Sequence, residues 1–378
     1  MDKPLRILVV DDSALMRRLL RELLESDPEL RIVGEAADGR EALAQVVELR
    51  PDLVILDVRM PVMDGLETTR QIMAYTPTPI LVVTASLSSY EVDITFQMLG
   101  AGALDVMEKP RLGDAAAVEA ARRSLLRKVR LLARVKVVTH LRGRRQAPAP
   151  RAPGGTYRAG LLYGGGAAPV PHRPPRAVAP PPATIRDVLA PFPAVVIGAS
   201  TGGPRAVRQV LAGLPRDFAA AILVVQHIAQ GFSQGMAEWL AESVSLPVSL
   251  AYEGVPLSPG HVLLAPDCFD LLVRPDGAVH LSSLPLLLQR PAIDIAMQSV
   301  AEVFGAATVG VLLTGMGRDG AVGMQAIRRA GGLTIAQEEA SCTIFGMPRA
   351  AIELGAAELV LPPARIAEML RERMGVRA

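Results

Sequence analysis

Residues 52–67 read DLVILDVRMPVMDGLE, and this stretch decides the fold of the first third of the chain. Its apolar run LVIL is too short for a buried helix and ends in Asp57, which is typical of a buried strand. On both sides of it, short apolar runs alternate with amphipathic helical patterns. This alternation predicts a parallel sheet with helices on both faces. The expected strands are Leu5–Val10, Arg31–Ala36, Leu53–Asp57, Ile80–Thr84 and Ala103–Met107.

Polar residues follow these strands, where the functional residues of parallel sheets gather. They are Asp11, Asp12, Asp57, Thr84 and Lys109. Three carboxylates that converge on one crevice repel one another unless a cation joins them, and oxygen ligands suit Mg²⁺. Lys109 adds a fixed positive charge, so one carboxylate can attack a phosphoryl donor. Each residue alone could be a helix cap or a strand end, but together they favour a phosphate-accepting site.

The composition excludes several classes of protein. Half of the 378 residues are hydrophobic, 3% are aromatic and 21% are charged, which is typical of a folded chain with two or three domains. The first residues carry too short an apolar run for a secretory signal, and no segment has 18 uninterrupted apolar residues. Two cysteines form no disulfide framework. We therefore expect a cytoplasmic protein that is not inserted in a membrane.

The net charge of +2 is unevenly distributed. Residues 1–119 hold 12 basic and 21 acidic residues, residues 120–185 hold 14 basic and no acidic ones, and residues 186–378 hold 14 basic and 17 acidic ones. These blocks predict an acidic domain, a basic connector and a near-neutral domain. The connector begins with a helical pattern and becomes rich in Pro, Gly and Ala over residues 146–183, which indicates a flexible linker. A solvated tether that lies against the acidic domain is favoured over a nucleic-acid or membrane tether.

A second parallel, helix-covered sheet is expected after residue 192. Its strands are predicted at Ala194–Ile197, Ala221–Gln226, Thr308–Leu313 and Leu333–Ala336, and its helices at Pro204–Leu214, Ser233–Ser243, Ile293–Phe304 and Val322–Ala330.

Three strand ends of this second domain carry residues whose side chains could take part in catalysis. Ser200 stands in the Gly-rich turn GASTGGP, His227 ends AAILVVQH, and Asp319 follows a strand in GMGRDG. Taken alone, each of these residues is more simply interpreted as a helix cap or a residue of the core. Together they supply a nucleophile, a base and an orienting carboxylate at one sheet edge, as acyl transfer requires.

Other assignments stay open at this point. The order Ser–His–Asp along the chain differs from the Ser–Asp–His order of α/β-hydrolases. Asp294 is a rival for the third position, although Asp319 has the better turn context. Cys268 and Cys342 are conceivable nucleophiles, but a small buried hydrophobic residue is the simpler interpretation of each.

Residues 6–112 resemble the response-regulator receiver family, on the runs VVDDSALMR, DLVILDVRMPVMDGLE, PILVVTA and DVMEKP. The resemblance implies a flavodoxin-like (βα)5 fold and Asp57 as the phosphoacceptor. It also implies Mg²⁺ ligation by Asp11, Asp12, Asp57 and the Arg59 carbonyl, and sensing of the phosphoryl group by Thr84 and Lys109. Many receivers carry an aromatic switch residue three positions before the Lys, where this chain has Val106.

Residues 193–362 resemble the catalytic domain of the chemotaxis protein-glutamate methylesterases, on runs that include VVIGASTGGP, VVQHIA, LLTGMGRDGAVGM and GGLTIAQEEASCTIFGMPRAA. That family joins a receiver to this hydrolase. The resemblance implies Ser200, His227 and Asp319 as a triad, with Met316 and Thr201 at the oxyanion pocket and no cofactor for hydrolysis. It implies demethylation of glutamyl methyl esters, and deamidation of glutamines, in the cytoplasmic domains of chemoreceptors.

These resemblances predict a monomer that a chemotaxis-type histidine kinase phosphorylates and that binds no nucleic acid. The unphosphorylated receiver would cover the hydrolase, and phosphorylation of Asp57 would open it. Three alternatives are a transcription factor, a catalytically silent receptor-binding regulator, and a phosphorylation-controlled esterase of another substrate. The first is disfavoured because residues 186–378 hold no Lys and carry a slight negative balance.

Overall fold

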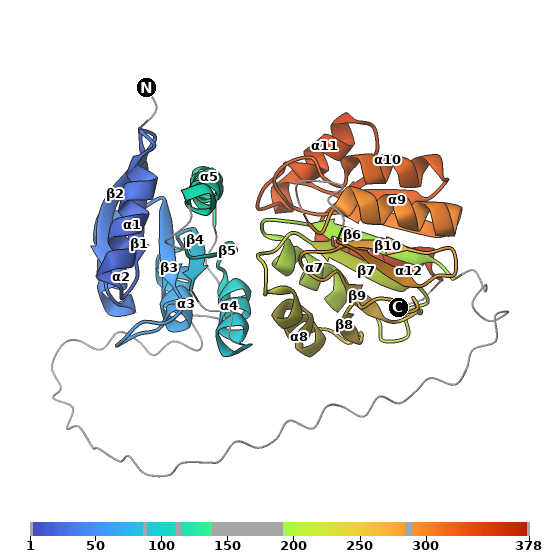
Figure 1. Cartoon of the computed structure of the whole chain (residues 1–378), viewed down its shortest axis with the longest axis horizontal. Coiled ribbons are helices and arrows are strands. Elements are labelled where there is room, and N and C mark those ends of the chain that lie inside the picture. The colour runs from blue at the N-terminus through green and yellow to red at the C-terminus, as the bar shows by residue number, and fades with distance from the viewer. Residues whose placement is uncertain (1–2, 86–88, 111–114, 138–191, 284–289, 376–378) are drawn as a thin grey trace, which may run out of the picture.

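The chain folds into two α/β lobes (Figure 1), seen in a computed structural model that describes residues 3–85, 89–110, 115–137, 192–283 and 290–375. The linker predicted over residues 146–183 lies outside the described residues. The predicted boundaries at residues 119 and 185 stay predictions. The helical start of the predicted connector is described and belongs to the N-terminal lobe.

The N-terminal lobe is a five-stranded parallel sheet in the order β2-β1-β3-β4-β5. This confirms the predicted α/β fold. The one strand that differs clearly is β5, expected from Ala103 but beginning at Asp105, because the Ala103 N–H still bonds the Met98 carbonyl at the end of α4. The strands are β1 Leu5–Val10, β2 Leu30–Ala36, β3 Leu53–Asp57, β4 Ile80–Thr84 and β5 Asp105–Glu108.

Five helices cover the two faces of this sheet. Ser13, Asp38 and Asp64 accept hydrogen bonds from the first turns of α1, α2 and α3, as expected of N-cap residues. Helix α5 buries one apolar face, including Leu125 and Val129, against the sheet. The helices are α1 Ala14–Glu25, α2 Gly39–Leu49, α3 Gly65–Tyr75, α4 Ser89–Ala101 and α5 Ala115–Leu132.

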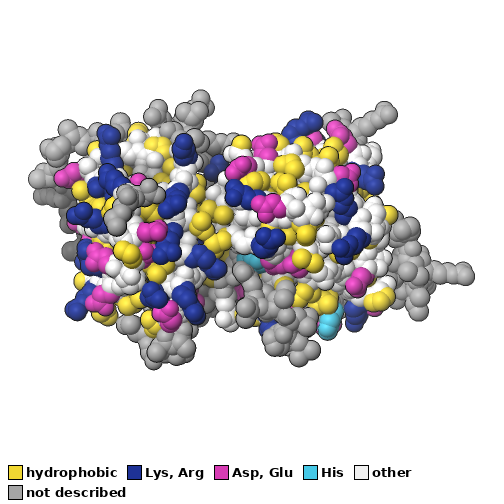
Figure 2. All heavy atoms as spheres, turned by 90° about the horizontal axis from the view of Figure 1, so that it is seen from above, with side chains coloured by type: hydrophobic (Ala, Val, Ile, Leu, Met, Phe, Trp, Pro, Cys, Tyr) yellow, Lys and Arg dark blue, Asp and Glu magenta, His cyan; other side chains and the backbone are white. Residues whose placement is uncertain are grey.

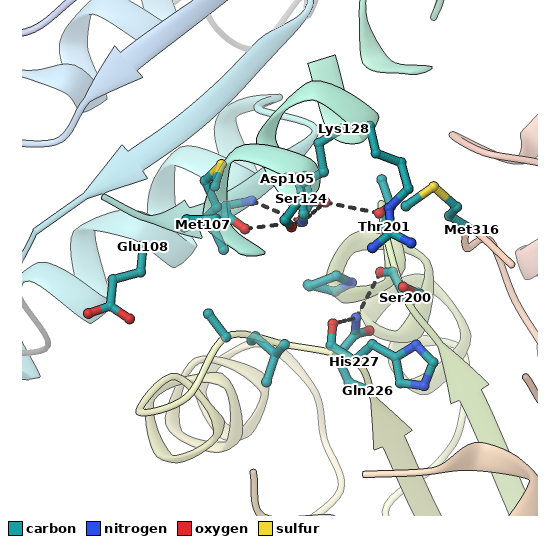
Figure 3. Close-up of a pocket in the computed structure, with 16 residues that line it drawn as sticks. Asp105, Met107, Glu108, Ser124, Lys128, Ser200, Thr201, Gln226, His227 and Met316 are labelled. Carbon is teal, nitrogen blue, oxygen red and sulfur yellow. Dashed lines mark hydrogen bonds and ion pairs between the residues drawn. The ribbon is translucent and has the colours of Figure 1, made fainter. Parts of the chain in front are cut away.

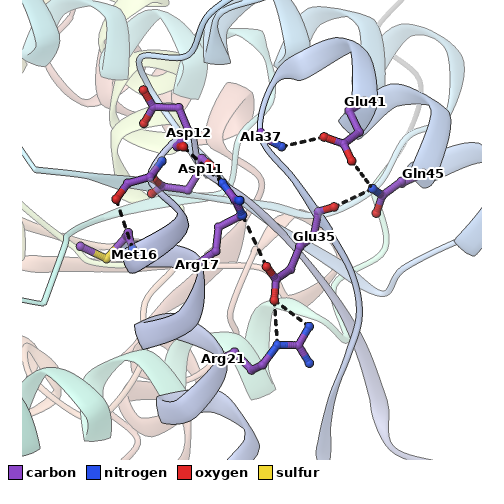
Figure 4. Close-up of polar contacts among 10 residues, drawn as sticks. Asp11, Asp12, Met16, Arg17, Arg21, Glu35, Ala37, Glu41 and Gln45 are labelled. Carbon is purple, nitrogen blue, oxygen red and sulfur yellow. Dashed lines mark hydrogen bonds and ion pairs between the residues drawn. The ribbon is translucent and has the colours of Figure 1, made fainter.

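A polar network fixes the turn after β1, which carries Asp11 and Asp12 (Figure 4). Arg17 donates to the carbonyls of both residues, at 2.7 and 3.2 Å. Glu35 on β2 pairs with Arg17 at 3.4 Å and with Arg21 at 2.7 Å. The arginine thus ties the first helix to the acidic turn, so the two carboxylates start from a fixed backbone.

The C-terminal lobe is a seven-stranded parallel sheet in the order β14-β13-β12-β6-β7-β9-β8, beside an antiparallel pair β10–β11. The four strands predicted from the sequence form its centre. The remaining strands were not predicted, because runs of three or four residues carry no clear period. The strands are β6 Ala194–Ala199, β7 Ala221–Gln226, β8 Val248–Leu250, β9 Val262–Leu264, β10 Asp270–Val273, β11 Val279–Ser282, β12 Thr308–Leu312, β13 Leu333–Gln337 and β14 Leu359–Leu361.

The predicted helices of this lobe are present within two residues of their expected ends, and further short helices were not predicted. The α-helices are α7 Gly203–Ala212, α8 Ser233–Ser243, α9 Ile293–Phe304, α10 Ala321–Arg329, α11 Met347–Glu353 and α12 Pro363–Arg373, and the 3₁₀ turns are η1 Gly305–Ala307 and η2 Glu339–Ser341.

The two lobes meet where α4 packs on α8 (Figure 1). Phe96 of α4 is fully buried between the rings of Phe232, at 6.5 Å between centroids, and Trp239, at 5.6 Å. A Cβ on Gly235 would lie 2.0 Å from Val92, so this glycine allows the two helices their close approach. The buried cores of the two lobes are therefore continuous through this contact.

Basic and acidic side chains are interspersed on the face shown in Figure 2, which looks down on α5 and the helices beside it. Among the residues that the structure describes, no helix is both long and apolar enough to cross a membrane.

Substituting Phe96→Ala should loosen the contact between the lobes, because truncation of a buried Phe costs about 3–5 kcal/mol. We expect a larger radius of gyration by small-angle X-ray scattering. Tyr75→Ala, at a 42% exposed aromatic on α3, is the matched control and should leave the radius unchanged. An unchanged radius for Phe96→Ala, in a folded protein, would contradict this interpretation of the contact.

Candidate functional site

Ser200 lies on a tight turn between β6 and α7. Its N–H donates to the Thr314 carbonyl at 3.0 Å, and its carbonyl accepts from the Gly203 N–H at 2.7 Å. Gly202 follows with a φ of +75°, and a Cβ there would lie 2.2 Å from the Thr343 hydroxyl. The turn is thus possible only with glycine at this position, and it presents Ser200 at the strand end, as the sequence predicts.

His227 directly follows β7, the neighbour of β6, and it is bonded to Asp319. The distance from Nε2 to Asp319 Oδ2 is 2.7 Å. The other ring nitrogen, Nδ1, is buried and has no hydrogen-bond partner among the described residues. The predicted pair of His227 and Asp319 is therefore formed through Nε2, and Nδ1 is the ring nitrogen that stays without a partner among the described residues.

Asp319 is held as an anion by its surroundings. Burial alone would raise the pKa of this carboxyl, but the hydrogen bond and charge of His227 and two backbone N–H groups outweigh burial and lower it. The backbone donors are Ile293, at 2.8 Å from Oδ2, and Asp294, at 2.9 Å from Oδ1. The side chain of Asp294 does not take the place of Asp319: its Oδ1 accepts from the Gly323 N–H at 2.7 Å.

Ser200 and His227 line one cavity of about 330 Å³ (Figure 3). Thr201 and Met316, the predicted oxyanion residues, line it too. The opposite wall comes from the N-terminal lobe, with residues of β5 and α5 that include Asp105 and Lys128. The cavity thus joins the predicted catalytic residues of one lobe to a wall supplied by the other.

Asp105 is a site residue that the sequence did not reveal. Its carboxylate accepts a hydrogen bond from the Thr201 hydroxyl at 3.0 Å and forms an ion pair with Lys128 of α5 (Figure 3). The residue stands in the run DVMEKP that marks the fifth strand, but only the packing of one lobe on the other brings it to Thr201. No local sequence signal could have predicted that contact.

Gln226 is a second residue that the sequence analysis missed. Its amide donates to the Ser200 carbonyl at 2.7 Å and to the His227 carbonyl at 2.9 Å. It therefore ties the turn that carries Ser200 to the strand end that carries His227. A buried polar residue directly before His227 was the available signal.

The two cysteines do not fit a nucleophile. Cys268 is exposed and Cys342 is half-buried, so neither is the small buried residue that the sequence favoured. Burial raises the pKa of the Cys342 thiol to about 12, and partial burial with the charge of Asp267 raises the pKa of the Cys268 thiol. A thiol attacks as the thiolate, so both shifts disfavour attack.

In the N-terminal lobe, Asp11, Asp12 and Asp57 each offer an oxygen within 4.8 Å of the others. The cluster fits a divalent cation, because three hard oxygen donors converge there. Lys109 Nζ lies 2.7 Å from Asp11 and 3.0 Å from Asp57. Burial raises the pKa of Asp57 to about 6, against the lowering effect of Lys109. The backbone carbonyl of Arg59 as a fourth ligand stays a prediction.

Thr84, the predicted phosphoryl sensor, forms its hydrogen bond with helix α4 and not with Asp57. Its hydroxyl lies 3.1 Å from Glu91 Oε2 on α4. The other oxygen of Glu91 forms an ion pair with Arg59 in the loop after β3. Val106, at the position of the aromatic switch in many receivers, is buried in β5.

These two sites define a class of protein: a phosphate-accepting regulatory domain joined to a hydrolytic α/β domain. The description "Response regulator receiver domain" matches residues 7–120, and "CheB methylesterase" matches residues 195–370. The chain belongs to the protein-glutamate methylesterase/protein-glutamine glutaminase family.

Three relatives illustrate the similarity. Family members of that name from Geobacter metallireducens and Anaeromyxobacter dehalogenans are 43% and 44% identical, over 97% and 98% of this chain and 97% of their own lengths. The crystal structure of the Thermotoga maritima CheB methylesterase catalytic domain is 39% identical, covers 48% of this chain and 98% of its own, and has a TM-score of 0.47.

Gly202→Ala should disrupt the nucleophile turn, because the added Cβ overlaps Thr343 and the left-handed backbone costs about 1–3 kcal/mol. Gly254→Ala is the matched control: its φ is +77°, but nothing lies within 4 Å of the added Cβ. We expect Gly202→Ala to lower the Tm more than the control does and to abolish labelling of Ser200 by a fluorophosphonate probe. Equal labelling of both variants would contradict a sterically fixed turn.

Proposed function

We propose that the chain is a phosphorylation-controlled serine hydrolase that demethylates glutamyl methyl esters of chemoreceptor proteins. One observation carries the proposal: Ser200 and His227 line a single cavity at the strand ends, and His227 is bonded to Asp319 behind it. The family to which the chain belongs is named for this activity, and the site supplies the groups that ester hydrolysis needs.

In the proposed mechanism, His227 Nδ1 takes the proton of Ser200 Oγ while Nε2–H stays bonded to Asp319. Ser200 attacks the carbonyl carbon of the side-chain ester. Backbone N–H groups at Thr201 and Met316 receive the oxyanion, where loss of one donor typically costs 10²–10³-fold in rate. The imidazolium returns its proton to methanol as the C–O bond breaks. Water then cleaves the acyl-enzyme by the same route and leaves a glutamate.

A glutamine side chain can follow the same path, with ammonia as the leaving group. The amide carbonyl is less reactive than the ester, so we propose deamidation as the slower activity. Neither reaction draws on a cofactor in this mechanism, because the base, the nucleophile and the oxyanion donors all come from the chain.

The N-terminal lobe would accept a phosphoryl group on Asp57. Asp11, Asp12 and Asp57 would hold Mg²⁺, which supplies charge neutralisation for the transfer. Lys109 already bridges two of these carboxylates and would pair with the phosphoryl oxygens. The proposed donor is a histidine kinase of a chemotaxis-type pathway.

The receiver would inhibit the hydrolase by closing its cavity. Residues of β5 and α5 of the N-terminal lobe line the cavity opposite Ser200 and His227. They occupy the side from which a folded receptor segment would have to approach Ser200. Asp105 also engages the hydroxyl of Thr201, so the closed arrangement places an anion beside the proposed oxyanion site.

Phosphorylation would act on this contact through α4. Movement of the Thr84 hydroxyl towards a phosphoryl group on Asp57 would break its bond to Glu91 at the start of α4. The same helix carries Val92 and Phe96, which pack on α8. This route does not need an aromatic residue at the position of Val106.

The proposed partners are thus a kinase and the cytoplasmic domains of methylated chemoreceptors. A cytoplasmic location and a monomeric state stay predictions, and so does the absence of a nucleic-acid partner.

Ser200→Ala should reduce methanol release from a methylated receptor by at least about 10⁴-fold, because loss of a triad member leaves only binding and the oxyanion donors. Methanol is measured with the full chain and radiolabelled receptor membranes. Ser233→Ala, at a buried serine outside the cavity, is the control for removal of a hydroxyl. Normal turnover by Ser200→Ala would refute the proposed nucleophile.

Asp105→Ala should raise the basal rate of the unphosphorylated enzyme about 2- to 10-fold, since a hydrogen bond contributes about 0.5–1.5 kcal/mol. Asp57→Asn should instead abolish the stimulation by acetyl phosphate and Mg²⁺. Asp93→Ala, at an exposed acidic residue on α4, controls for the lost charge. A basal rate in Asp105→Ala no higher than in Asp93→Ala would contradict the inhibitory contact.

A further inference from the structure

Two helices begin beside Asp319, and neither has a capping side chain of its own. The N-cap residue of α9 is Ala292, and that of α10 is Gly320. The first N–H groups of a helix need acceptors from elsewhere, and a buried N–H without one is costly. The acceptors at this place are three aspartates: Asp270, Asp294 and Asp319.

The aspartates cap the two helices in a reciprocal way. Asp319, which lies two residues before α10, accepts from the first two N–H groups of α9, those of Ile293 and Asp294. The side chain of Asp294 in turn accepts from the N–H of Gly323 in the first turn of α10, at 2.7 Å. Each helix thus supplies the cap of the other.

Asp270 of β10 completes the arrangement. It is fully buried, and its Oδ1 accepts from the Ala292 N–H at 2.9 Å. Arg290 lies 3.9 Å from its other oxygen. Asp270 thereby holds the start of α9 to strand β10, and Asp294 holds it to helix α10.

The carboxyl groups of Asp294 and Asp319 lie close enough to influence each other electrostatically. Two adjacent carboxylates repel unless one holds a proton. Burial and the charge of Asp319 raise the pKa of Asp294, whereas the pKa of Asp319 is lowered. Asp294 is therefore the more readily protonated member of the pair, and Asp319 faces His227 with the lower pKa.

We propose that Asp294 is a positioning residue of the hydrolase, which aims Asp319 at His227 by joining the starts of α9 and α10. The proposal rests on the proposed role of Ser200, His227 and Asp319 as the triad. Asp294 is not a catalytic residue, because its hydrogen bonds among the described residues join it to Gly323 and Asp319 and not to His227 or Ser200. Its effect passes through the direction of the Asp319 carboxylate, and small misplacements of a catalytic group cost large factors in rate.

The test compares Asp294→Ala with Asp294→Asn in the full chain, by methanol release from methylated receptor. Asparagine keeps an acceptor for the Gly323 N–H, so Asp294→Asn should stay within about threefold of the wild-type kcat. Alanine keeps no such acceptor, so kcat should fall at least about tenfold while KM changes by less than about twofold. Glu302→Ala, an exposed acidic residue on the same helix, should match the wild type in both constants.

Two results would overturn the proposal: a wild-type kcat for Asp294→Ala, or equal losses for the alanine and asparagine variants. Should Asp294→Ala fail to show a cooperative melt, Asp294→Glu replaces it, because glutamate keeps the carboxyl and moves it by one methylene. The same tenfold loss of kcat is then expected, and a wild-type kcat overturns the proposal. Ser200→Ala in the same assay separates the proposed function from the proposed role of Asp294. An active Ser200→Ala variant would refute the proposed function. An inactive Ser200→Ala variant beside a fully active Asp294→Ala variant would refute only the role of Asp294.

Discussion

The placement of charged groups at the ends of parallel strands is the constraint on which both lobes depend. Parallel strands bring their carboxyl ends to one edge, so residues far apart in the chain meet there. A charge at such a place is partly removed from water and needs fixed partners. In the first lobe, Lys109 forms an ion pair with Asp57. In the second lobe, His227 and the first N–H groups of α9 form hydrogen bonds with Asp319.

Strand β5 links these two centres more directly than any other described element. Lys109 follows its last residue and touches Asp57, and Asp105 begins it and touches Thr201. The strand has four residues, or about 13 Å at 3.3 Å per residue. A change of charge at Asp57 is therefore one short, rigid strand away from the turn that carries Ser200. Helix α4 offers the parallel route, since it carries Glu91 at one end and Phe96 in the middle of the contact with α8.

The sequence predicted what local patterns encode and missed what packing creates. The strand ends at Ser200, His227 and Asp319 were predictable, because each follows an apolar run that fixes its place at the sheet edge. The contact of Asp105 with Thr201 was not predictable, because it arises from the packing of two domains and no local sequence pattern encodes that packing. The ring orientation of His227 was equally hidden, since either nitrogen satisfies the pattern. Asp294 was a rival third triad member from sequence alone, and its bond to Gly323 is what separates the two aspartates.

The energies of the contact between the lobes indicate where a phosphoryl signal would have to act. Full burial of a Phe or Val side chain contributes about 1.5–3 kcal/mol, whereas the bond between Asp105 and Thr201 contributes about 0.5–1.5 kcal/mol. Shifting a closed state from 99% to 1% takes about 5.5 kcal/mol. Loss of the polar contact alone falls short of that, so it can raise the population of the open state only a few-fold. The apolar packing of Phe96 and Val92 on α8 supplies the larger share, because both side chains are buried there. An effective switch must therefore displace α4, and Glu91 stands at the start of that helix with Thr84 as its partner.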